Sequence, residues 1–357
     1  MKILLLSKYS RLGASSRLRA LQFIPYLQRC GHVVTVDCLF DEAYLTMLYM
    51  SKKRSFWSII KLYLRRIYVL LNARRYDVVW IEKEVLPYFP AVFEWLFKKF
   101  NIPYVVDYDD AIFHNYDLSP YAPVRRLLGR KIDSVMLNAR SVVAGNEYLA
   151  NRAIQAGAQS VHVVPTVVDS QRYQAHACAA DKLLTVGWIG SPSTEKYVVG
   201  IREALRNVNK RFPFHLVLMG ASIHVSQELA GLDVEVKAWS EDSENAFIQG
   251  LDVGIMPLVD GPWEKGKCGY KLIQYMACAV PVVATPVGVN VKIVSDNKCG
   301  LLAADLQEWE AALNSLLSDA QSRSVFGAAG REAVNNEYCL AVQAPRLRHI
   351  LEHAASR

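Results

Sequence analysis

The chain has 357 residues, 52% of them hydrophobic and 21% charged, with a formal net charge of +7. This is the composition of an ordinary globular protein, and the length predicts two domains of about 150 residues each. The excess of positive charge is too small to indicate a nucleic-acid-binding protein, so we expect no nucleic acid among its partners.

The cysteines and the amino terminus both favour the cytoplasm. Seven cysteines are present and none forms a C-x-x-C pair, so neither a disulfide framework nor a zinc site is indicated. The apolar run that starts at Ile3 is too short for a signal peptide. No stretch approaches the roughly 20 apolar residues that cross a bilayer. We therefore predict a cytoplasmic protein.

The first half of the chain alternates between strand and helix patterns. A strand predicted at Ile3–Ser7 enters a loop that contains Gly13. A helical pattern follows and ends near Gly31, with one apolar face formed by Leu18, Leu21, Ile24 and Leu27. Further strands are predicted at Val33–Val36, Val78–Ile81, Tyr104–Val106, Ser141–Ala144 and His162–Val164. This alternation predicts a doubly wound α/β domain with a mostly parallel sheet.

A second alternation begins after a polar linker at Ser170–His176. Its strands are predicted at Leu184–Ile189, His215–Met219, Val234–Lys237, Val253–Met256 and Val280–Ala284. We therefore expect two Rossmann-like domains, residues 1–170 and 171–340. Ligands of such domains bind at the carboxyl ends of the strands, here expected in a cleft between the domains.

The segment from Ala43 to Tyr76 is basic, with eight Lys or Arg and no Asp or Glu. A helical projection places Arg54, Lys61 and Arg65 on one side. The apolar side is formed by Phe56, Ile59, Ile60, Tyr63, Ile67 and Leu70. Two interpretations stay open: residues 52–75 lie on an anionic membrane surface, or the helix packs its apolar face on the domain core.

The segment from Pro257 to Ala277 has the pattern of a phosphate-binding loop. A strand ends at Pro257, a loop rich in glycine and proline follows, and a helix is predicted to begin near Gly269. A helix N-terminus carries partial positive charge and suits a phosphate. Lys267 and Lys271 are four residues apart, so both can reach that end. The alternative is an ordinary glycine-rich loop with solvated lysines.

Residues 266–277 read G-K-C-G-Y-K-L-I-Q-Y-M-A and lead into a P-V-V-A strand. This run resembles the donor-binding region of family 4 retaining glycosyltransferases, in a bacterial branch with a G-K-x-G-x-K-L-x-Q-Y-M-A motif. Gly187–Thr194, Val105–Ala111 and Ala144–Leu149 resemble other stretches of the same branch. The resemblance implies the GT-B fold, in which a C-terminal helix, here about residues 341–357, crosses back to the first domain.

The resemblance also implies a nucleotide-diphosphate sugar donor, with fixed cations at the diphosphate and no metal or other cofactor. The family's loop lysine matches Lys196, and its arginine position is Ser191, beside Gly190. The family's glutamate pair falls on Gly266 and Gln274, of which Gln274 can still bind ribose hydroxyls. Lys196 and Lys271 are therefore expected to stabilise the leaving diphosphate. The expected donor-binding set also includes Glu264, Lys267, Cys268, Gly269 and Tyr270.

Asp107, Asp109 and Asp110 follow a strand end, where three carboxylates in four residues repel one another. The family has a catalytic-site histidine where Asp109 falls. A carboxylate there is expected to stabilise oxocarbenium charge or to accept the acceptor's proton. A helix N-cap role for Asp110 and a D-x-D metal site stay open. His114 either joins this site or is structural.

Three other residues have two interpretations each. Gly13 and Arg17 in the first loop are expected to approach phosphate or acceptor, although Arg17 also fits an ion-paired helix start. Asn146 either lines the cleft or caps the next helix. Trp188 either stacks on the nucleotide base or belongs to the core.

The function implied is a retaining hexosyltransferase. It would move a hexose from the donor to a glycan or lipid-linked glycan, in the synthesis of bacterial surface polysaccharide such as lipopolysaccharide. The enzyme would be cytoplasmic or peripheral on the inner membrane face. Two alternatives remain: a sugar-nucleotide epimerase on the same fold, and a non-catalytic nucleotide-sugar-binding protein. A G-x-G-x-x-G fingerprint is absent, so NAD is not expected.

Overall fold

The computed structural model describes residues 1–49, 55–173, 175 and 183–356. The basic residues Lys52, Lys53 and Arg54, and residues 174 and 176 of the predicted linker, lie outside the described residues. The chain forms two compact units. Unit 1 contains Met1–Thr166, Gly266–Cys268 and Gln343–Arg357, and unit 2 contains Val167–Lys265 and Gly269–Val342.

Unit 1 is built on a six-stranded parallel sheet with the order β2-β1-β3-β4-β5-β6. Its strands are β1 Lys2–Tyr9, β2 Val33–Phe40, β3 Val78–Glu82, β4 Tyr104–Tyr108, β5 Ser141–Ala144 and β6 Val161–Val163. Every residue of β3 and β4 is buried, as expected for central strands that helices cover on both faces. All six strands predicted in this half of the chain are confirmed.

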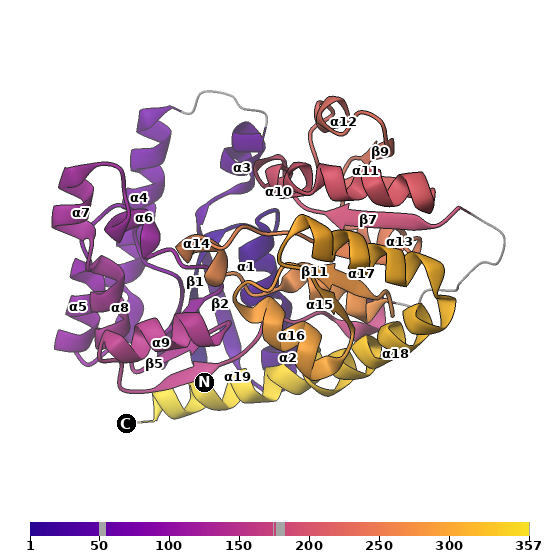
Figure 1. The fold of residues 1–357 in the computed structure, drawn as a ribbon. Coiled ribbons are helices and arrows are strands. Elements are labelled where there is room, and N and C mark those ends of the chain that lie inside the picture. The colour runs from indigo at the N-terminus through magenta and orange to yellow at the C-terminus, as the bar shows by residue number, and fades with distance from the viewer. Residues whose placement is uncertain (50–54, 174, 176–182, 357) are drawn as a thin grey trace. The chain divides into compact units, whose positions relative to one another are not determined.

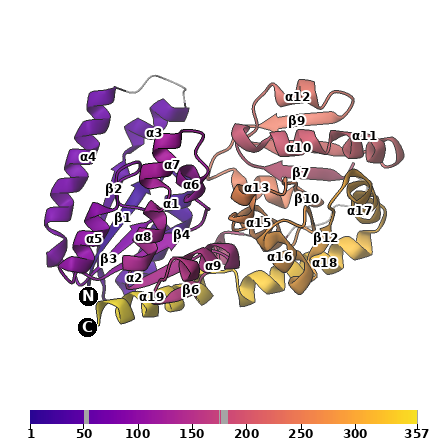
Figure 2. The same cartoon turned by 60° about the vertical axis from the view of Figure 1, so that its left-hand side comes forward.

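The helices of unit 1 follow the strands in the α/β alternation visible in Figures 1 and 2. They are α1 Ala14–Arg19, η1 Leu21–Phe23, α2 Ile24–Arg29, α3 Glu42–Tyr49, α4 Phe56–Leu71, η2 Ala73–Arg75, α5 Val92–Lys99, α6 His114–Asp117, α7 Ala122–Leu128, α8 Lys131–Asn138 and α9 Glu147–Gln155. The single helix predicted up to Gly31 is wrong, because the chain breaks after α1 and restarts at α2. Pro25 lies in the first turn of α2, where its missing N–H costs no hydrogen bond.

Unit 2 has a second six-stranded parallel sheet, with the order β12-β11-β10-β7-β8-β9. Its strands are β7 Thr185–Ile189, β8 His215–Met219, β9 Asp233–Lys237, β10 Val253–Met256, β11 Val282–Ala284 and β12 Gly300–Leu302. The five predicted strands are confirmed. The edge strand β12 was missed because three half-buried residues give no periodic signal.

Two apolar clusters cover the two faces of this second sheet, one around Tyr275 and the other around Trp188 and Trp309. The helical segments are η3 Ser170–Arg172, η4 Pro192–Thr194, α10 Lys196–Gly200, α11 Arg202–Arg211, α12 Val225–Glu228, α13 Glu244–Gln249, α14 Pro262–Lys265, α15 Tyr270–Ala277, α16 Val289–Asn297, α17 Leu306–Ser318 and α18 Ala320–Asn336. The last helix, α19 Leu340–Ala355, begins in unit 2, and its residues from Gln343 onward belong to unit 1. The prediction of a C-terminal helix that returns to the first domain is confirmed.

Within the described ranges, no helix combines the length and apolar character needed to span a bilayer. The six described cysteines are free thiols.

Candidate functional site

In unit 2, the side chain of Lys271 in α15 reaches the end of β7. Its Nζ lies 4.4 Å from the centroid of the Trp188 ring. Trp188 is fully buried in β7, so it belongs to the core and does not stack on a base. Gly190 follows β7. A Cβ added there would lie 2.1 Å from the Trp188 ring and 2.9 Å from Lys271 Nζ. Only glycine at this position therefore leaves room for the lysine over the indole, where the cation–π contact orients the ammonium group.

The helix that carries Lys271 begins as predicted. Gly269 is the N-cap of α15 with φ 65°, a left-handed conformation that favours glycine. A Cβ at Gly269 would also lie 2.5 Å from Ile293 Cδ1. Tyr270 and Lys271 are the first two residues of α15, in the turn where a helix favours an anion. The ammonium of Lys271 and the helix N-terminus thus contribute positive charge from the same turn.

Tyr197 contacts both Lys196, its neighbour in the chain, and Glu264. Ser191 is exposed and caps η4 together with Thr194 in a capping box. Lys196 is exposed at the start of α10, with its Nζ 5.2 Å from the ring centroid of Tyr197. The Tyr197 hydroxyl donates a hydrogen bond to Glu264 in α14. Burial and this carboxylate raise the pKa of Tyr197, so the hydroxyl stays a donor.

Gln274 lies inside a buried hydrogen-bond network of unit 2. The residue is 2% exposed, and its Nε2 donates to the Tyr173 hydroxyl at 3.2 Å. That hydroxyl donates to Glu244 Oε1 at 2.9 Å, and Trp239 Nε1 donates to Glu244 Oε2 at 2.8 Å. The sequence analysis expected Gln274 to bind ribose, and this network occupies its amide nitrogen.

In unit 1, the three aspartates at the carboxyl end of β4 are balanced by buried cations. Arg19 donates through Nε and Nη2 to Asp107 Oδ1, at 2.9 and 2.7 Å. Lys83 Nζ lies 2.9 Å from Asp109 Oδ1 and 3.6 Å from Asp110 Oδ2. The Ser15 hydroxyl donates to Asp109 Oδ2. Two cations therefore offset the repulsion that the sequence predicted among the carboxylates.

The protonation preferences of these aspartates differ. Burial disfavours charge on Asp109, but the Lys83 ammonium and the Ser15 hydroxyl outweigh it and lower the pKa of its carboxyl. Burial and the charge of Asp109 raise the pKa of Asp110. Burial also raises the pKa of Asp107 to about 6, although Arg19 opposes the shift. Asp109 is thus the carboxylate held most firmly in its ionised form.

Lys83 is a site residue that the sequence analysis missed. It follows β3 in a left-handed backbone conformation, with φ 67°, and is 5% exposed. Despite the cost of burial, Asp109 and Asp110 raise the pKa of its ammonium. The signal was the polar run Glu82-Lys83-Glu84 directly after an apolar strand. Polar residues at the carboxyl end of a parallel strand are candidates for function.

Glu82 fixes the first loop of unit 1. Its Oε2 accepts hydrogen bonds from the Lys8 amide at 2.8 Å and from the Ser16 hydroxyl. Only glycine fits at position 13, because a Cβ there would lie 2.4 Å from the Cβ of Tyr9. The group that lies close to the backbone at Gly13 is thus a side chain of the protein itself.

The tripeptide Gly266–Cys268 packs within unit 1, at the carboxyl ends of β4 and β5. Asn146 donates through Nδ2 to the carbonyls of Gly266 and Lys267, at 3.0 and 2.9 Å. Its Oδ1 accepts from the Leu149 amide and caps α9, so the capping interpretation of Asn146 is confirmed. The Cys268 thiol donates to the Asp109 carbonyl at 3.1 Å, and burial raises the pKa of this thiol.

Two glycines make room for this tripeptide. A Cβ at Gly145 would lie 2.2 Å from Cys268 Sγ, and a Cβ at Gly266 would lie 2.5 Å from Ala111 Cβ. Lys267 therefore groups with the aspartates, and its charge acts on the pKa of Asp110. Lys271 belongs to unit 2, and the expectation that both lysines reach the start of α15 stays a prediction.

Other predicted site residues of unit 1 have hydrogen-bond partners of their own. Arg17 is 7% exposed and donates to the Arg11 carbonyl at 3.3 Å. The His114 ring nitrogens lie 2.8 Å from Asp117 Oδ1 and 2.9 Å from the Tyr148 hydroxyl, as in its structural interpretation. The N-cap role for Asp110 is wrong, because Phe113 is the N-cap of α6. Among the described residues, no group of three or more His, Cys, Asp or Glu is placed to hold a metal ion.

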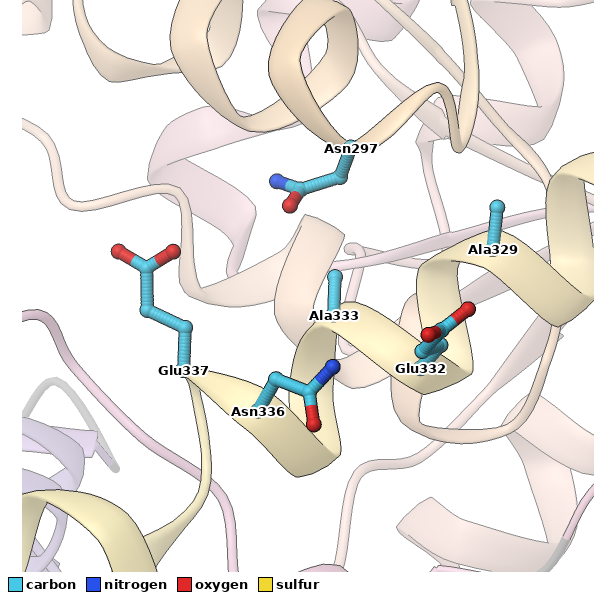
Figure 3. A pocket seen from close by; sticks show the side chains of 6 residues that line it. All are labelled: Asn297, Ala329, Glu332, Ala333, Asn336 and Glu337. Carbon is cyan, nitrogen blue, oxygen red and sulfur yellow. The ribbon is translucent and has the colours of Figure 1, made fainter.

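A pocket of about 210 Å³ lies between the end of α16 and α18 in unit 2, lined by Asn297, Glu332, Asn336 and Glu337 among others (Figure 3). The end of α16 leads into the amino end of β12. Rossmann-like sheets bind nucleotides at the opposite, carboxyl edge. Its acidic lining also disfavours a phosphate, so we exclude it from the candidate site.

Comparisons with known proteins find relatives in sequence and in fold. Residues 180–319 match the family model described as "Glycosyl transferases group 1". A stretch of 74 residues is 39% identical to alpha-maltose-1-phosphate synthase of Mycolicibacterium smegmatis, covering 18% of this chain and 19% of the synthase. The aligned stretch therefore spans about a fifth of that relative.

Solved structures match nearly the whole chain. HepE of Anabaena, solved with UDP and with UDP-glucose, has a TM-score of 0.73 at 18% identity, over 99% of this chain and 100% of HepE. Sucrose-phosphate synthase of Thermosynechococcus elongatus gives 0.74 at 14% identity, over 99% and 98% of the two chains. WaaG, a glycosyltransferase involved in lipopolysaccharide biosynthesis, gives 0.71 at 13% identity, over 98% and 99%. The chain therefore has the GT-B fold, and residues 180–319 resemble group 1 glycosyl transferases.

Proposed function

We propose that this chain is a retaining, metal-independent glycosyltransferase of the family 4 type. It transfers a hexose from a nucleotide-diphosphate sugar to a glycan or lipid-linked glycan in the cytoplasm. Unit 2 binds the donor, and unit 1 carries the acceptor side. The group 1 domain match and the GT-B fold support the reaction class.

The position of Lys271 is the observation that carries this proposal. Its ammonium lies over Trp188 beside Gly190, in the first turn of α15. A diphosphate leaving a sugar gains negative charge, and preorganised cations stabilise that charge without reorganisation. Lys196 at the start of α10 supplies a second cation on the same side of the sheet, after β7. Fixed lysines and a helix N-terminus then take the place that a metal has in other transferases.

The proposal gives Asp109 an electrostatic role. The sequence left open whether this carboxylate stabilises oxocarbenium charge or accepts a proton. A carboxyl with a lowered pKa is a weak base near neutral pH but keeps its negative charge. We therefore favour stabilisation of positive charge on the sugar ring, with Lys83 and Ser15 holding the carboxylate in place.

The residues at the family's glutamate positions point to a modified donor site. Gly266 packs on Ala111 and Gln274 donates to Tyr173, so neither position presents a carboxylate. Glu264, oriented by Tyr197, is an acidic side chain of this loop and is our candidate for binding the donor sugar. We propose that Gln274 meets the ribose through its amide oxygen.

The donor and acceptor classes follow by analogy with the proteins of the same fold. HepE is solved with UDP-glucose, so a uridine-diphosphate hexose is the first donor to test. WaaG acts in lipopolysaccharide biosynthesis, which supports a role in surface polysaccharide for this chain.

A thermal-shift panel of UDP, GDP, dTDP and ADP sugars tests donor binding in the full chain. We expect one nucleotide class to raise the melting temperature, and Lys271→Ala to remove most of that shift. Lys292→Ala, at an exposed lysine of α16, serves as the matched control. No response to any of the four classes would contradict the proposal.

A second experiment incubates the bound donor with and without a lipid-linked glycan extract. Transfer with the anomeric configuration retained, read by NMR, is expected only when acceptor is present. Release of a modified sugar without acceptor would indicate the epimerase. Donor binding with no product under either condition would indicate the binding protein.

A further inference from the structure

Helix α4 has an inner face that packs on unit 1. Leu70 is 5% exposed there, and Arg66 is fully buried. Arg66 pairs with Asp37 and donates through Nη2 to the Ser7 carbonyl at 2.7 Å. Ile59 and Tyr63 lie on the same side and are partly buried. The inner face of α4 therefore packs on the domain core, which was one of the two interpretations of the basic segment. Arg66 is buried in this face and cannot contact a partner.

The outer face of α4 carries a second apolar stripe. Trp57, Leu64, Tyr68 and Leu71 are 76%, 60%, 70% and 73% exposed. Their spacing of seven, four and three residues places them in one line along the helix. Single exposed apolar residues are ordinary, but a continuous stripe on a protein surface marks an interaction site. Figure 2 shows α4 along an edge of unit 1, with α5 near its C-terminal end.

The exposed stripe continues past the end of α4. The Arg74 guanidinium in η2 lies 4.5 Å from the ring centroid of Phe100, just after α5. Lys99 Nζ lies 4.9 Å from the ring of Trp95 on the same helix. Both aromatic residues are 49% exposed. The outer face of α4, η2 and the end of α5 therefore form one surface, which we call the α4–α5 surface.

The charge of the α4–α5 surface indicates what covers it. Between Glu42 and Asp77 the sequence contains no acidic residue. Lys61, Arg65, Arg74 and Arg75 are exposed beside the stripe, and Arg65 also pairs with Asp37 at 3.6 Å. A symmetric dimer through this surface would bring like charges together. Tryptophan and tyrosine next to lysine and arginine are instead typical of the interface between a bilayer and water.

A groove of about 480 Å³ between α3 and α4 adjoins the same cations. Lys61 and Arg65 contribute two cations to its lining and Asp41 one carboxylate, and Met47, Ile59 and Leu62 are among its apolar residues. Apolar volume beside exposed cations suits an amphiphile with an anionic headgroup better than a water-soluble ligand.

We propose that the α4–α5 surface docks on an anionic phospholipid bilayer. The apolar stripe enters the headgroup region, and the flanking cations contact lipid phosphates. This inference is independent of the proposed function, because binding to a membrane needs neither donor nor turnover.

Sedimentation of the full chain with vesicles tests the proposal. We compare vesicles of phosphatidylcholine alone with vesicles that also contain phosphatidylglycerol. The wild type should partition to the anionic vesicles at low salt and be released as salt rises. Trp57→Ser combined with Leu64→Ser should weaken partitioning at least tenfold. Neutralising three cations, Lys61→Gln, Arg74→Gln and Arg75→Gln, should weaken it about a hundredfold, at about fivefold for each charge.

Matched controls change exposed residues of the same kinds in unit 2. Ile223→Ser with Val325→Ser removes side chains that are 78% and 52% exposed. Arg202→Gln with Lys292→Gln removes two exposed charges. Both controls should partition like the wild type. Because all substituted side chains are exposed, the melting temperature should stay within a few degrees of wild type in every variant.

Three results would overturn the proposal. One is a wild type that stays in the supernatant with anionic vesicles at low salt. Another is equal weakening by the unit 2 controls. The third is a dimer, seen by light scattering, that the stripe variants dissociate while vesicle partitioning is unchanged. That result would assign the surface to a second copy of the chain.

Discussion

Replacing Lys83 with methionine should destabilise unit 1 by about 3–5 kcal/mol near neutral pH, the usual cost of leaving a buried charge without its partner. The lysine is 5% exposed, and its Nζ lies 2.9 Å from Asp109 and 3.6 Å from Asp110. Coulomb's law at the shorter distance, with an effective dielectric constant of about 20, gives about 6 kcal/mol of attraction. The methionine has a similar volume, so the cost comes from the two carboxylates and not from a cavity.

The pH dependence gives this prediction a distinct signature. The raised pKa of Lys83 means that its stabilisation is complete below the unfolded lysine pKa and is lost as the pH rises through the folded value. The lowered pKa of Asp109 means that its stabilisation is complete above the unfolded pKa of about 3.9 and is lost at lower pH. In the wild type the ion pair is therefore complete from about pH 4 to pH 10, so a change of the deficit within that range comes from the variant. In the variant, both carboxyls would protonate more readily, so its deficit should shrink on the acid side.

Thermal unfolding by calorimetry measures the effect. For a unit of this size each kcal/mol moves the melting temperature by about 2–4 °C, so the unit 1 transition should fall by about 6–20 °C at pH 7. Lys292→Met is the control, because that lysine is 57% exposed and lies 3.9 Å from Asp296. Its effect should stay within about 1 kcal/mol. A variant that melts within 2 °C of wild type, or whose deficit is the same from pH 4 to pH 7, would refute the role given to Lys83.

Three other substitutions test the proposed transfer reaction. Lys271→Ala should lower kcat about 100- to 1000-fold in a transfer assay, while Lys292→Ala keeps the wild-type rate; equal rates in both would remove Lys271 from the reaction. Asp109→Asn should leave donor affinity within about twofold by calorimetric titration but slow transfer at least tenfold; an unchanged rate would exclude the electrostatic role. Gly190→Ala should weaken donor binding about tenfold or more, because the new Cβ would lie 2.1 Å from the Trp188 ring and displace Lys271. Wild-type affinity in that variant would show that the lysine position is not needed.

The strands were predictable because burial gives them a local signal. Central parallel strands are buried on both faces and read as short apolar runs, as at β3 and β4. The helix boundaries in the first loop were not predictable from the apolar period alone. The period continues across α1 and α2, but the backbone leaves the helical conformation at Ala20, with φ −127° and ψ −57°.

The candidate site was predictable only where its residues are close in sequence. The helix start at Gly269 and Lys271 belongs to one loop and one turn, and turn chemistry is a local property. The cations that balance the aspartates are distant in sequence. Arg19 lies 88 residues from Asp107 along the chain, and Lys83 reaches Asp109 from a neighbouring strand. No local pattern pairs such residues, although polar side chains at adjacent strand ends make the pairing plausible once the sheet order is known.

Glycines illustrate why part of a site remains hidden in a sequence. Gly13, Gly190 and Gly266 all lie in loops and belong to the expected donor-binding set, and Gly13 was expected to approach phosphate or acceptor. In the structure, the atoms that exclude a Cβ belong to Tyr9 at Gly13, to Trp188 and Lys271 at Gly190, and to Ala111 at Gly266. A glycine in a sequence indicates that some group lies close to its backbone, but it does not indicate whether that group belongs to a ligand or to the protein. Only at Gly190 does the close neighbour include a charged group of the proposed donor site. A substitution at Gly266 would therefore perturb the packing of the tripeptide on unit 1, whereas one at Gly190 acts on the cation that the proposed reaction requires.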